Sequence, residues 1–355
     1  MLVGIVVLSL ILVHGSHSVP DVTRLLQKHP NWSFRVESIE NIIQRTKNST
    51  RGSKFQYSNH DLMTILKANL GPGETHIVRK VGDPKYVSVE QLPSSFDARE
   101  HWPHCADLLE KVEDEGHCHA DSPAVVASIM TDRMCIFSNG AVKEPLSQYV
   151  LTCAETCTNE PRIQKSWNYT VDHGIPTGGA YGSKKGCYPN PDQPCFHSND
   201  TYHTYQNGHG KKLKPCNEEL YYDRVCPKKC SNPKYRKSLD ADRKRTTTWY
   251  WVSDEEYIIR NEIMTYGSVA TSMELFEDLL EKPKGIYWVD RKAKFLSFYK
   301  YMKLIGWGVE NDVKYWLAVN TWDSWGDNKV FKVPRGINYW YIEFFPTAGV
   351  FEDLD

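Results

Sequence analysis

The sequence predicts an α+β fold, with both helices and strands in a chain of 355 residues. Helix patterns lie at residues 122–137 and 253–267, and Tyr315, Leu317 and Val319 alternate as on a strand. The length allows one large domain and a smaller segment. The net charge of −1 and the 40% hydrophobic content are ordinary for a soluble globular protein, so no nucleic-acid partner is predicted.

Both helices have local signals at their ends. Ser122 followed by Pro123 favours a helix start, because serine caps the first turn and proline at the first helical position needs no hydrogen-bond donor. The second helix is predicted from a capping box at residues 253–256 and from Gly267, which suits a helix end. The apolar face of the first helix contains Val125, Ile129 and Met130.

The first residues predict a secretory signal peptide. Residues 2–13 are almost wholly apolar and are followed by small residues, so we assign residues 1–18 to the signal. A buried N-terminal strand or a membrane anchor is the alternative. Residues 2–13 are too short to span a bilayer, and no other stretch is long and apolar enough, so no membrane span is expected.

Residues 19–91 are polar and contain two short helix-like patterns, at residues 36–43 and 61–66. The second pattern is broken by glycine and proline at residues 71–73. Residues 19–91 contain too little apolar surface for a core of their own. We therefore expect a segment that docks on the rest of the chain.

All ten cysteines lie between Cys105 and Cys230. An even, clustered set behind a signal peptide predicts disulfides in an oxidising compartment. Zinc is the competing interpretation, because residues 226 and 230 are closely spaced cysteines. The secretory context favours disulfides, and we predict no metal and no cofactor. Sequons for N-glycosylation agree with secretion and begin at Asn31, Asn48, Asn168 and Asn199.

Several motifs follow one another from residue 92 onward. Residues 92–103 read LPSSFDAREHWP, residues 306–311 read GWGVEN, and residues 315–328 read YWLAVNTWDSWGDN. They resemble the mature domain of cathepsin B, in the papain family of cysteine peptidases. The resemblance implies two halves, one helical and one a β-barrel, with the active site in the cleft between them. It also implies a propeptide at residues 19–91 that covers this cleft, and a cathepsin B-like domain at residues 92–355.

The active-site motif of this family, DQGSCGSCWAF, resembles residues 113–124, which read EDEGHCHADSPA. In this comparison Glu115 replaces the oxyanion glutamine and Asp121 replaces the catalytic cysteine. The family's histidine lies six residues before the GWG motif, where this chain has Lys300. Only the orienting asparagine, Asn320, is retained.

These replacements remove the groups that a cysteine peptidase needs, which are a thiolate, an imidazole and an oxyanion donor. Glu115 would repel a developing oxyanion. Asp121 and Lys300 would rebuild the family's thiolate–imidazolium pair as carboxylate and ammonium, both charged at neutral pH with reference pKa values of about 3.9 and 10.4. We expect a salt bridge that holds the two halves in register. Two unpaired, solvated charges are the alternative.

The resemblance also implies how the cysteines pair and how the substrate loops are altered. Every cysteine has a partner, in the pairs Cys105–Cys135, Cys118–Cys157, Cys153–Cys226, Cys187–Cys230 and Cys195–Cys216. The occluding loop of cathepsin B carries paired histidines, of which this chain keeps His197 and replaces the other with Ser198. Cys118 beside His119 is an alternative nucleophile. Its bridge to Cys157 is the simpler interpretation, since a bridged sulfur is no thiolate.

Residues 224–245 contain nine lysines and arginines. A site for a polyanion such as a sulfated glycan is one interpretation, and a solvated surface loop is the simpler one. His203 and His209 lie near one another in the sequence, but nothing nearby completes a set of metal ligands.

The resemblance and the replacements together predict a secreted or lysosomal cathepsin B-like protein without peptidase activity. It would act as a monomeric binding or decoy protein toward a peptide or protein, such as a protease inhibitor or a matrix component. Two other functions stay open. One is a hydrolase of altered chemistry that uses Asp121 as acid or base beside Lys300, and the other is residual proteolysis through Cys118.

Overall fold

The computed structural model describes residues 26–49, 76–116, 121–154, 162–197, 205–206, 212–216, 225–325 and 328–351. Some predicted features lie outside these residues. They are the signal peptide, the helix pattern at 61–66, Cys118, His119, Cys157, Ser198, Asn199, His203 and His209.

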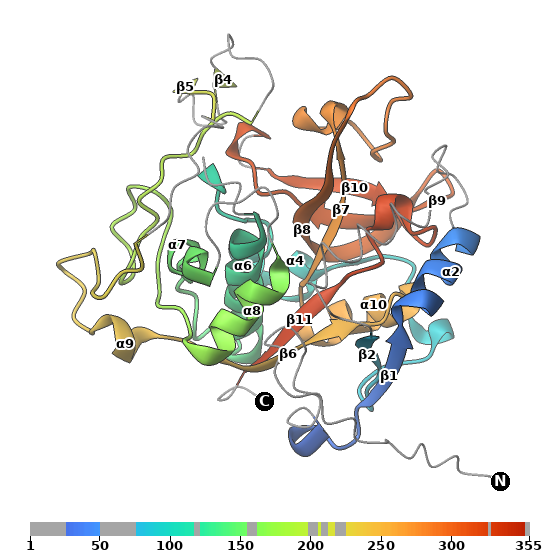
Figure 1. The fold of residues 1–355 in the computed structure, drawn as a ribbon, viewed down its shortest axis with the longest axis horizontal. Helices are drawn as coiled ribbons and strands as arrows, with labels where there is room; N and C mark the ends of the chain where they lie inside the picture. Colours follow the sequence, from blue (N-terminus) through green and yellow to red (C-terminus); the bar gives the residue numbers. More distant parts are fainter. Residues whose placement is uncertain are drawn as a thin grey trace.

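The helical half is arranged around α6, which runs from Asp121 to Phe137 and passes through the middle of the molecule (Figure 1). Almost all of its side chains are buried, and it packs against α7 and α8. None of the described helices is long and apolar enough to cross a membrane. The other helices are α2 (Ile39–Ser49), α4 (Ala98–His101), α5 (Ala106–Leu109), α7 (Gln148–Leu151), α8 (Ile163–Asp172), α9 (Leu239–Asp242) and α10 (Glu256–Tyr266).

The strands form a nine-stranded sheet and a separate hairpin within the described part of the chain. Neighbours in the large sheet follow the order β1-β2-β6-β11-β7-β8-β9-β10, and β3 pairs with β8. This mixture of helices and sheet confirms the predicted α+β class. The strands are β1 (Ser33–Ser38), β2 (His76–Gly82), β3 (Phe96–Asp97), β4 (Tyr205–Gln206), β5 (Lys212–Leu213), β6 (Thr246–Val252), β7 (Val269–Phe276), β8 (Phe295–Glu310), β9 (Val313–Val319), β10 (Val330–Pro334) and β11 (Thr347–Phe351).

The hairpin of β8 and β9 sets the register near the site. Asn311 and Asp312 connect the strands with φ values of 49° and 63°, and asparagine and aspartate tolerate such positive values in a two-residue hairpin turn. The antiparallel pairing of β7 with β8 places Lys300 opposite Met273. The predicted strand at Tyr315–Val319 lies within β9.

Three predicted helix boundaries are corrected by the structure. Ser122 was expected as the N-cap and Pro123 as the first helical residue, but α6 begins at Asp121, so Pro123 lies inside its first turn, where a missing N–H breaks no helical bond. In α10 the cap is Glu255, because the hydroxyl of Ser253 bonds to Glu255 instead of the helix. The pattern at residues 36–43 is split, since its first three residues belong to β1.

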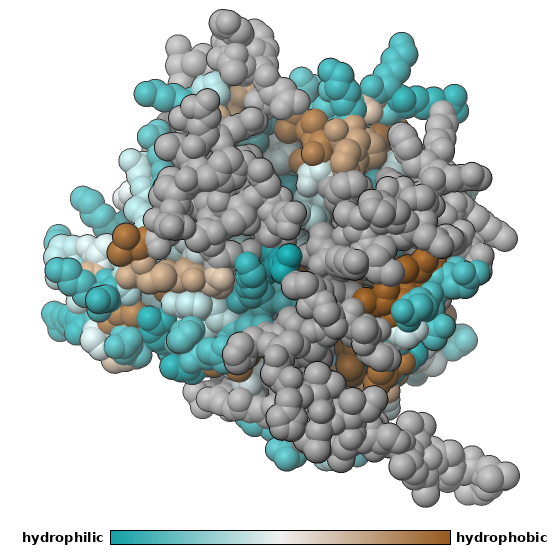
Figure 2. All heavy atoms as spheres, in the orientation of Figure 1, coloured by the Kyte–Doolittle hydropathy of each residue, from teal (hydrophilic) through white to brown (hydrophobic). Residues whose placement is uncertain are grey.

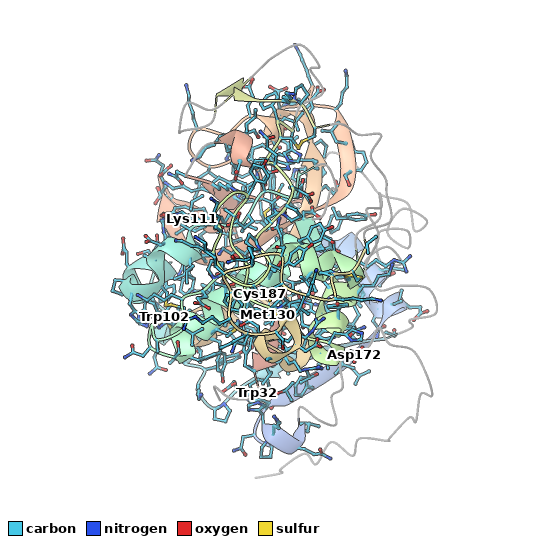
Figure 3. All side chains as sticks on the ribbon, turned by 90° about the vertical axis from the view of Figure 1, so that its left-hand side faces the viewer. Trp32, Trp102, Lys111, Met130, Asp172 and Cys187 are labelled. Carbon is cyan, nitrogen blue, oxygen red and sulfur yellow. A yellow bond between two sulfur atoms is a disulfide. The ribbon has the colours of Figure 1, made fainter. Side chains whose placement is uncertain are left out.

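The N-terminal segment docks on the rest of the chain through the sheet. β1 pairs with β2, and β2 runs parallel to β6, with Arg79 opposite Trp251 and Lys80 opposite Val252. Ile42 and Ile77 are buried in the same apolar cluster as α6. Trp32, labelled at the lower side of Figure 3, joins the other apolar cluster, which includes Tyr250 and Tyr266.

Lys80 connects this segment to the core through buried charges. Its Nζ lies 3.2 Å from Glu262 Oε2 and 3.0 Å from Asp83 Oδ2, and 3.4 Å from the ring centre of Trp32. Arg133 of α6 approaches Glu262 Oε1 at 2.9 Å. Burial disfavours the charge of Glu262, but Lys80 and Arg133 outweigh it and lower the pKa of this carboxyl to about 2. The N-terminal segment thus contributes a cation to a fully buried ion group beside α6.

We expect a glycan on Asn31 and none on Asn168. Asn31 is exposed just before β1. Asn168 lies in α8, its Oδ1 accepts a hydrogen bond of 2.7 Å from Trp249 Nε1, and Thr170 of the same sequon is fully buried. A bulky glycan needs a surface position. Asn31→Gln should lower the mass of the protein by one glycan, whereas Asn168→Gln should leave the mass unchanged. A glycopeptide at Asn168 would contradict this.

Candidate functional site

The four positions aligned with the family's active site come from four parts of the fold. Asp121 is the first residue of α6, Lys300 lies on β8, and Asn320 directly follows β9. Glu115 lies in the irregular stretch before α6. All four side chains are buried, and the structure brings the three charged ones into contact.

Lys300 lies at the centre of this group. Its Nζ is 2.8 Å from Glu115 Oε2 and 3.6 Å from Asp121 Oδ2, and it also donates to Thr321 Oγ1. The ammonium lies 4.4 Å from the ring centre of Trp322. The expected contact of Lys300 with Asp121 is present, but its contact with Glu115 is shorter. Two carboxyl groups therefore share one ammonium. The alternative of unpaired, solvated charges does not describe this geometry.

Glu115 is held entirely as a hydrogen-bond acceptor. Its Oε1 accepts from Trp322 Nε1 at 2.6 Å, and its Oε2 accepts from Lys300 and from Thr321 Oγ1 at 3.1 Å. A carboxylate in this state has no proton to donate to an oxyanion. The position that carries an oxyanion donor in the family is therefore a structural anion here.

Asp121 does not keep the ordinary acidity that we expected. Its Oδ2 accepts a hydrogen bond of 2.9 Å from the backbone N–H of Tyr301. Burial, assisted by the charge of Glu115 and opposed by Lys300, raises the pKa of Asp121 to about 7. The prediction that this carboxyl is fully charged at neutral pH is therefore wrong, because its reference pKa takes no account of lost solvation.

Asn320 does not orient Lys300 in the described structure. Its Oδ1 accepts a hydrogen bond of 2.7 Å from the backbone N–H of Thr321. The hydroxyl of Thr321 instead bridges Lys300 and Glu115. Thr321 is not among the residues predicted from the sequence, although its place between Asn320 and Trp322 in the aligned motif is a signal for it.

His197 and Asp114 extend the group on the side of Glu115. His197 Nε2 lies 3.4 Å from Asp114 Oδ1, its Nδ1 lies 3.6 Å from Glu115 Oε1, and its ring stacks on Trp322 at 5.5 Å. Burial works against the charge of Asp114, but His197 and then Lys329 outweigh it and lower the pKa of Asp114. The role of His197 in an occluding loop stays a prediction, because Ser198 lies outside the described residues.

One group of possible metal ligands occurs among the described residues, formed by Cys195, His197 and Cys216. The two cysteines are bonded to each other, with an S–S distance of 1.99 Å. A disulfide offers no thiolate to a metal, so His197 is the only ligand left. We assign no metal to this group.

The structure contains four of the implied disulfides. They are Cys105–Cys135, Cys153–Cys226, Cys187–Cys230 and Cys195–Cys216. The fifth, Cys118–Cys157, joins residues outside the described part of the chain. None of the described cysteines is free, so none of them offers a thiol for nucleophilic catalysis.

The arrangement of a central helix packed against a sheet, with aligned positions meeting where α6 begins, defines a papain-like fold. A profile described as papain family cysteine protease matches residues 92–349. The chain belongs to the papain family of cysteine proteases.

Relatives place it beside the cathepsin B-like members of that family. It is 32% identical to cathepsin B-like cysteine proteinase 6 of Caenorhabditis elegans over 288 residues, which are 78% of this chain and 73% of that protein. It is 31% identical to a cathepsin B-like cysteine proteinase of Schistosoma japonicum, over 73% of each chain. The solved structure of proCathepsin B S9 from Trypanosoma congolense shares the fold, with a TM-score of 0.58 at 22% identity, covering 88% of this chain and 97% of that one.

Proposed function

We propose that this chain is a cathepsin B-like protein without peptidase activity, which acts by binding a peptide or protein as a partner or decoy. The observation that carries the proposal is the buried group of Asp121, Lys300 and Glu115 at the positions of nucleophile, histidine and oxyanion donor. A carboxylate cannot form the thioester of a cysteine peptidase, and an ammonium held by two carboxylates cannot take up a proton.

The group of Asp121, Glu115 and Lys300 supports a papain-like fold in which these residues stabilise the structure instead of taking part in catalysis. In an active site, an activated nucleophile and its base must reach the substrate. Here Asp121, Glu115 and Lys300 are 5%, 4% and 2% exposed, and each already has partners in the protein. The group joins α6, β8 and the stretch before α6, so its contacts stabilise the fold where the family carries out catalysis.

Partner and location follow from the family and the disulfides. Members of a peptidase family recognise peptides and proteins, so a peptide, a protease inhibitor or a matrix component is the class of partner proposed. Four disulfides suit an oxidising compartment, which supports a secreted or lysosomal protein. We propose a monomer, with residues 19–91 as a propeptide-like segment.

We expect the purified protein, with or without residues 19–91, to cleave none of a broad set of fluorogenic peptides and to escape labelling by an epoxide probe of cysteine peptidases. The reason is the missing thiolate. The matched control is the variant Asp121→Cys, Lys300→His, Glu115→Gln, which restores the family's residues and tests whether the scaffold still presents substrate. Turnover that Asp121→Ala abolishes would overturn the proposal, and so would epoxide labelling of Cys118.

A second function has one observation in its favour. A carboxyl with a pKa of about 7 is suited to general acid–base catalysis at neutral pH, which is the property that burial confers on Asp121. A hydrolase of this kind would also need an oxyanion donor, and Glu115 is an acceptor. The two functions differ in one measurement, since only a hydrolase would show turnover with a pH profile that shifts in Asp121→Asn.

A further inference from the structure

Two loops on one side of the molecule are joined into a single surface. They comprise residues 181–187 and 228–237 and lie at the left of Figure 1, where hydrophilic residues are frequent in Figure 2. Figure 3 faces this side and labels Cys187. The Cys187–Cys230 disulfide connects the loops with a Cα–Cα distance of 4.7 Å.

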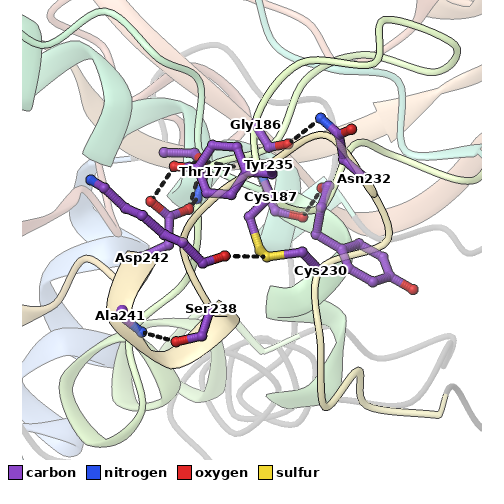
Figure 4. Close-up of a disulfide and its surroundings, with 12 residues drawn as sticks. Thr177, Gly186, Cys187, Cys230, Asn232, Tyr235, Ser238, Ala241 and Asp242 are labelled. Atoms are coloured by element: carbon purple, nitrogen blue, oxygen red, sulfur yellow. Dashed lines mark hydrogen bonds between the residues drawn. A yellow bond between two sulfur atoms is a disulfide. The ribbon is translucent and has the colours of Figure 1, made fainter.

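Hydrogen bonds hold the two loops together beside the disulfide (Figure 4). Asn232 Nδ2 donates to the carbonyl oxygens of Lys184 and Gly186, both at 2.9 Å, and its backbone N–H donates to Cys187 O at 3.2 Å. The hydroxyl of Tyr235 donates a hydrogen bond of 2.5 Å to Asp242 Oδ1, which holds Tyr235 in place. The backbones that carry the charges below are therefore fixed relative to one another.

These loops carry seven exposed cations, which we call the basic face. They are Lys184, Lys185, Lys228, Lys229, Lys234, Arg236 and Lys237. None of the seven forms an ion pair with the described part of the chain. Among the described residues, the carboxylates near these loops have other partners or are few: Asp240 pairs with Arg243 at 3.1 Å, Asp242 is buried, and Glu144 is an exposed acid near Tyr235.

We infer that the basic face binds a sulfated glycan chain, a function independent of the group around Asp121. Unpaired like charges repel one another, and a polyanion relieves this repulsion and releases its own counterions on binding. The chain as a whole has a net charge of −1, whereas residues 181–187 and 228–237 contain these cations and no aspartate or glutamate, so positive charge is in local excess here. Two loops tied by a disulfide lose little conformational entropy when they bind an extended ligand.

A glycan suits this face better than a nucleic acid. The disulfide beneath it forms in oxidising compartments, where sulfated glycans are the polyanions present. Binding of single-stranded nucleic acid relies on stacking of bases on aromatic side chains. Tyr181 is the one exposed aromatic residue in the two loops, while Tyr235 is partly buried and bonded to Asp242.

The test uses the full-length protein and immobilised heparin, with N- and O-desulfated heparin as the comparison that lacks sulfate groups and keeps only its carboxylates. The variant Lys184→Glu, Lys185→Glu, Lys234→Glu, Lys237→Glu should bind heparin at least about ten-fold more weakly than the unchanged protein at 0.15 M NaCl. The matched control has four exposed cations outside the basic face reversed, and comprises Lys284→Glu, Arg291→Glu, Lys292→Glu and Lys314→Glu. It has the same net charge and should retain affinity within about three-fold.

Each outcome bears on the inference. A ten-fold or larger loss in the first variant alone, and no binding to desulfated heparin, would support it. Absence of heparin binding by the unchanged protein, or equal losses in the two variants, would overturn it. Single-stranded DNA is a further arm, and DNA binding as tight as heparin binding, lost in the same variant, would assign the face to nucleic acid and overturn the glycan. Both variants change exposed side chains only, and unfolding temperatures check that they remain folded.

Discussion

Lys80→Ala should destabilise the folded protein by about 3–5 kcal/mol, the loss expected when one partner of a buried ion group is removed. Lys80 is fully buried between Glu262, Asp83 and the ring of Trp32. Without its ammonium, Glu262 keeps only Arg133 as a neighbouring cation, and a cavity opens under β2. Urea unfolding of the purified variant measures the change.

Lys85 provides the matched control for this prediction. It lies five residues further along the same segment, is exposed, and forms no ion pair with the described residues, so Lys85→Ala should change stability by about 0.5 kcal/mol or less. The double variant Lys80→Met, Glu262→Gln should recover part of the loss, because it removes both charges together. Equal stability of Lys80→Ala and Lys85→Ala would show that the segment carrying residue 80 does not stabilise the domain.

Lys300→Met should destabilise the protein at pH 7.5 by about 3–5 kcal/mol, because Glu115 and Asp121 would remain buried without their shared cation. The loss should shrink at pH 5, since a carboxyl that has lost its cation can take up a proton. Lys314→Met changes an exposed residue of β9 and should have an effect of about 0.5 kcal/mol or less. A neutral result for Lys300→Met at both pH values would refute the ion group as a stabilising element.

Asp121 should itself make stability depend on pH. Its pKa is raised to about 7 in the folded state from an ordinary 3.8, so between these values the folded protein holds a proton that the unfolded chain has released. Stability from this group is therefore full below about pH 4 and falls as the pH rises toward 7. Asp121→Asn should flatten this fall by at least about 1 kcal/mol between pH 5 and 7.5. Glu113, with a pKa also raised to about 7 by burial, leaves the remaining slope.

The motifs were sufficient to predict the class of fold, and they are the basis on which the altered positions are assigned. The GWG and NTW blocks are runs of rare residues in a set order, so they align Lys300 and Asn320 without knowledge of the structure. The start of the central helix was predicted to within two residues, because a serine–proline pair marks it locally. Such signals depend only on residues that are neighbours in the chain, so they can be recognised without knowledge of the tertiary structure.

The partners of the site residues could not be predicted in the same way. The sequence suggested a pair of Asp121 with Lys300, whereas the closer partner of Lys300 is Glu115, 185 residues away in the chain. That choice depends on where β8 passes the stretch before α6. Likewise, residues 19–91 read as a polar segment, and nothing local indicates that Lys80 is fully buried among aromatic rings supplied by other elements.

Asp121 illustrates the difference between what the sequence determines and what only the tertiary structure determines. The sequence alone aligns a carboxylate with the thiol of the papain family, because the flanking residues resemble the family's motif on either side. Only the tertiary structure decided what that carboxylate does, since its surroundings come from β8, Glu115 and the start of α6 together. Acidity is set by solvation and by charges within a few ångströms. Those neighbours are brought together by folding and are not adjacent in the chain, so a buried Asp121 with a pKa of about 7 is a property of the fold.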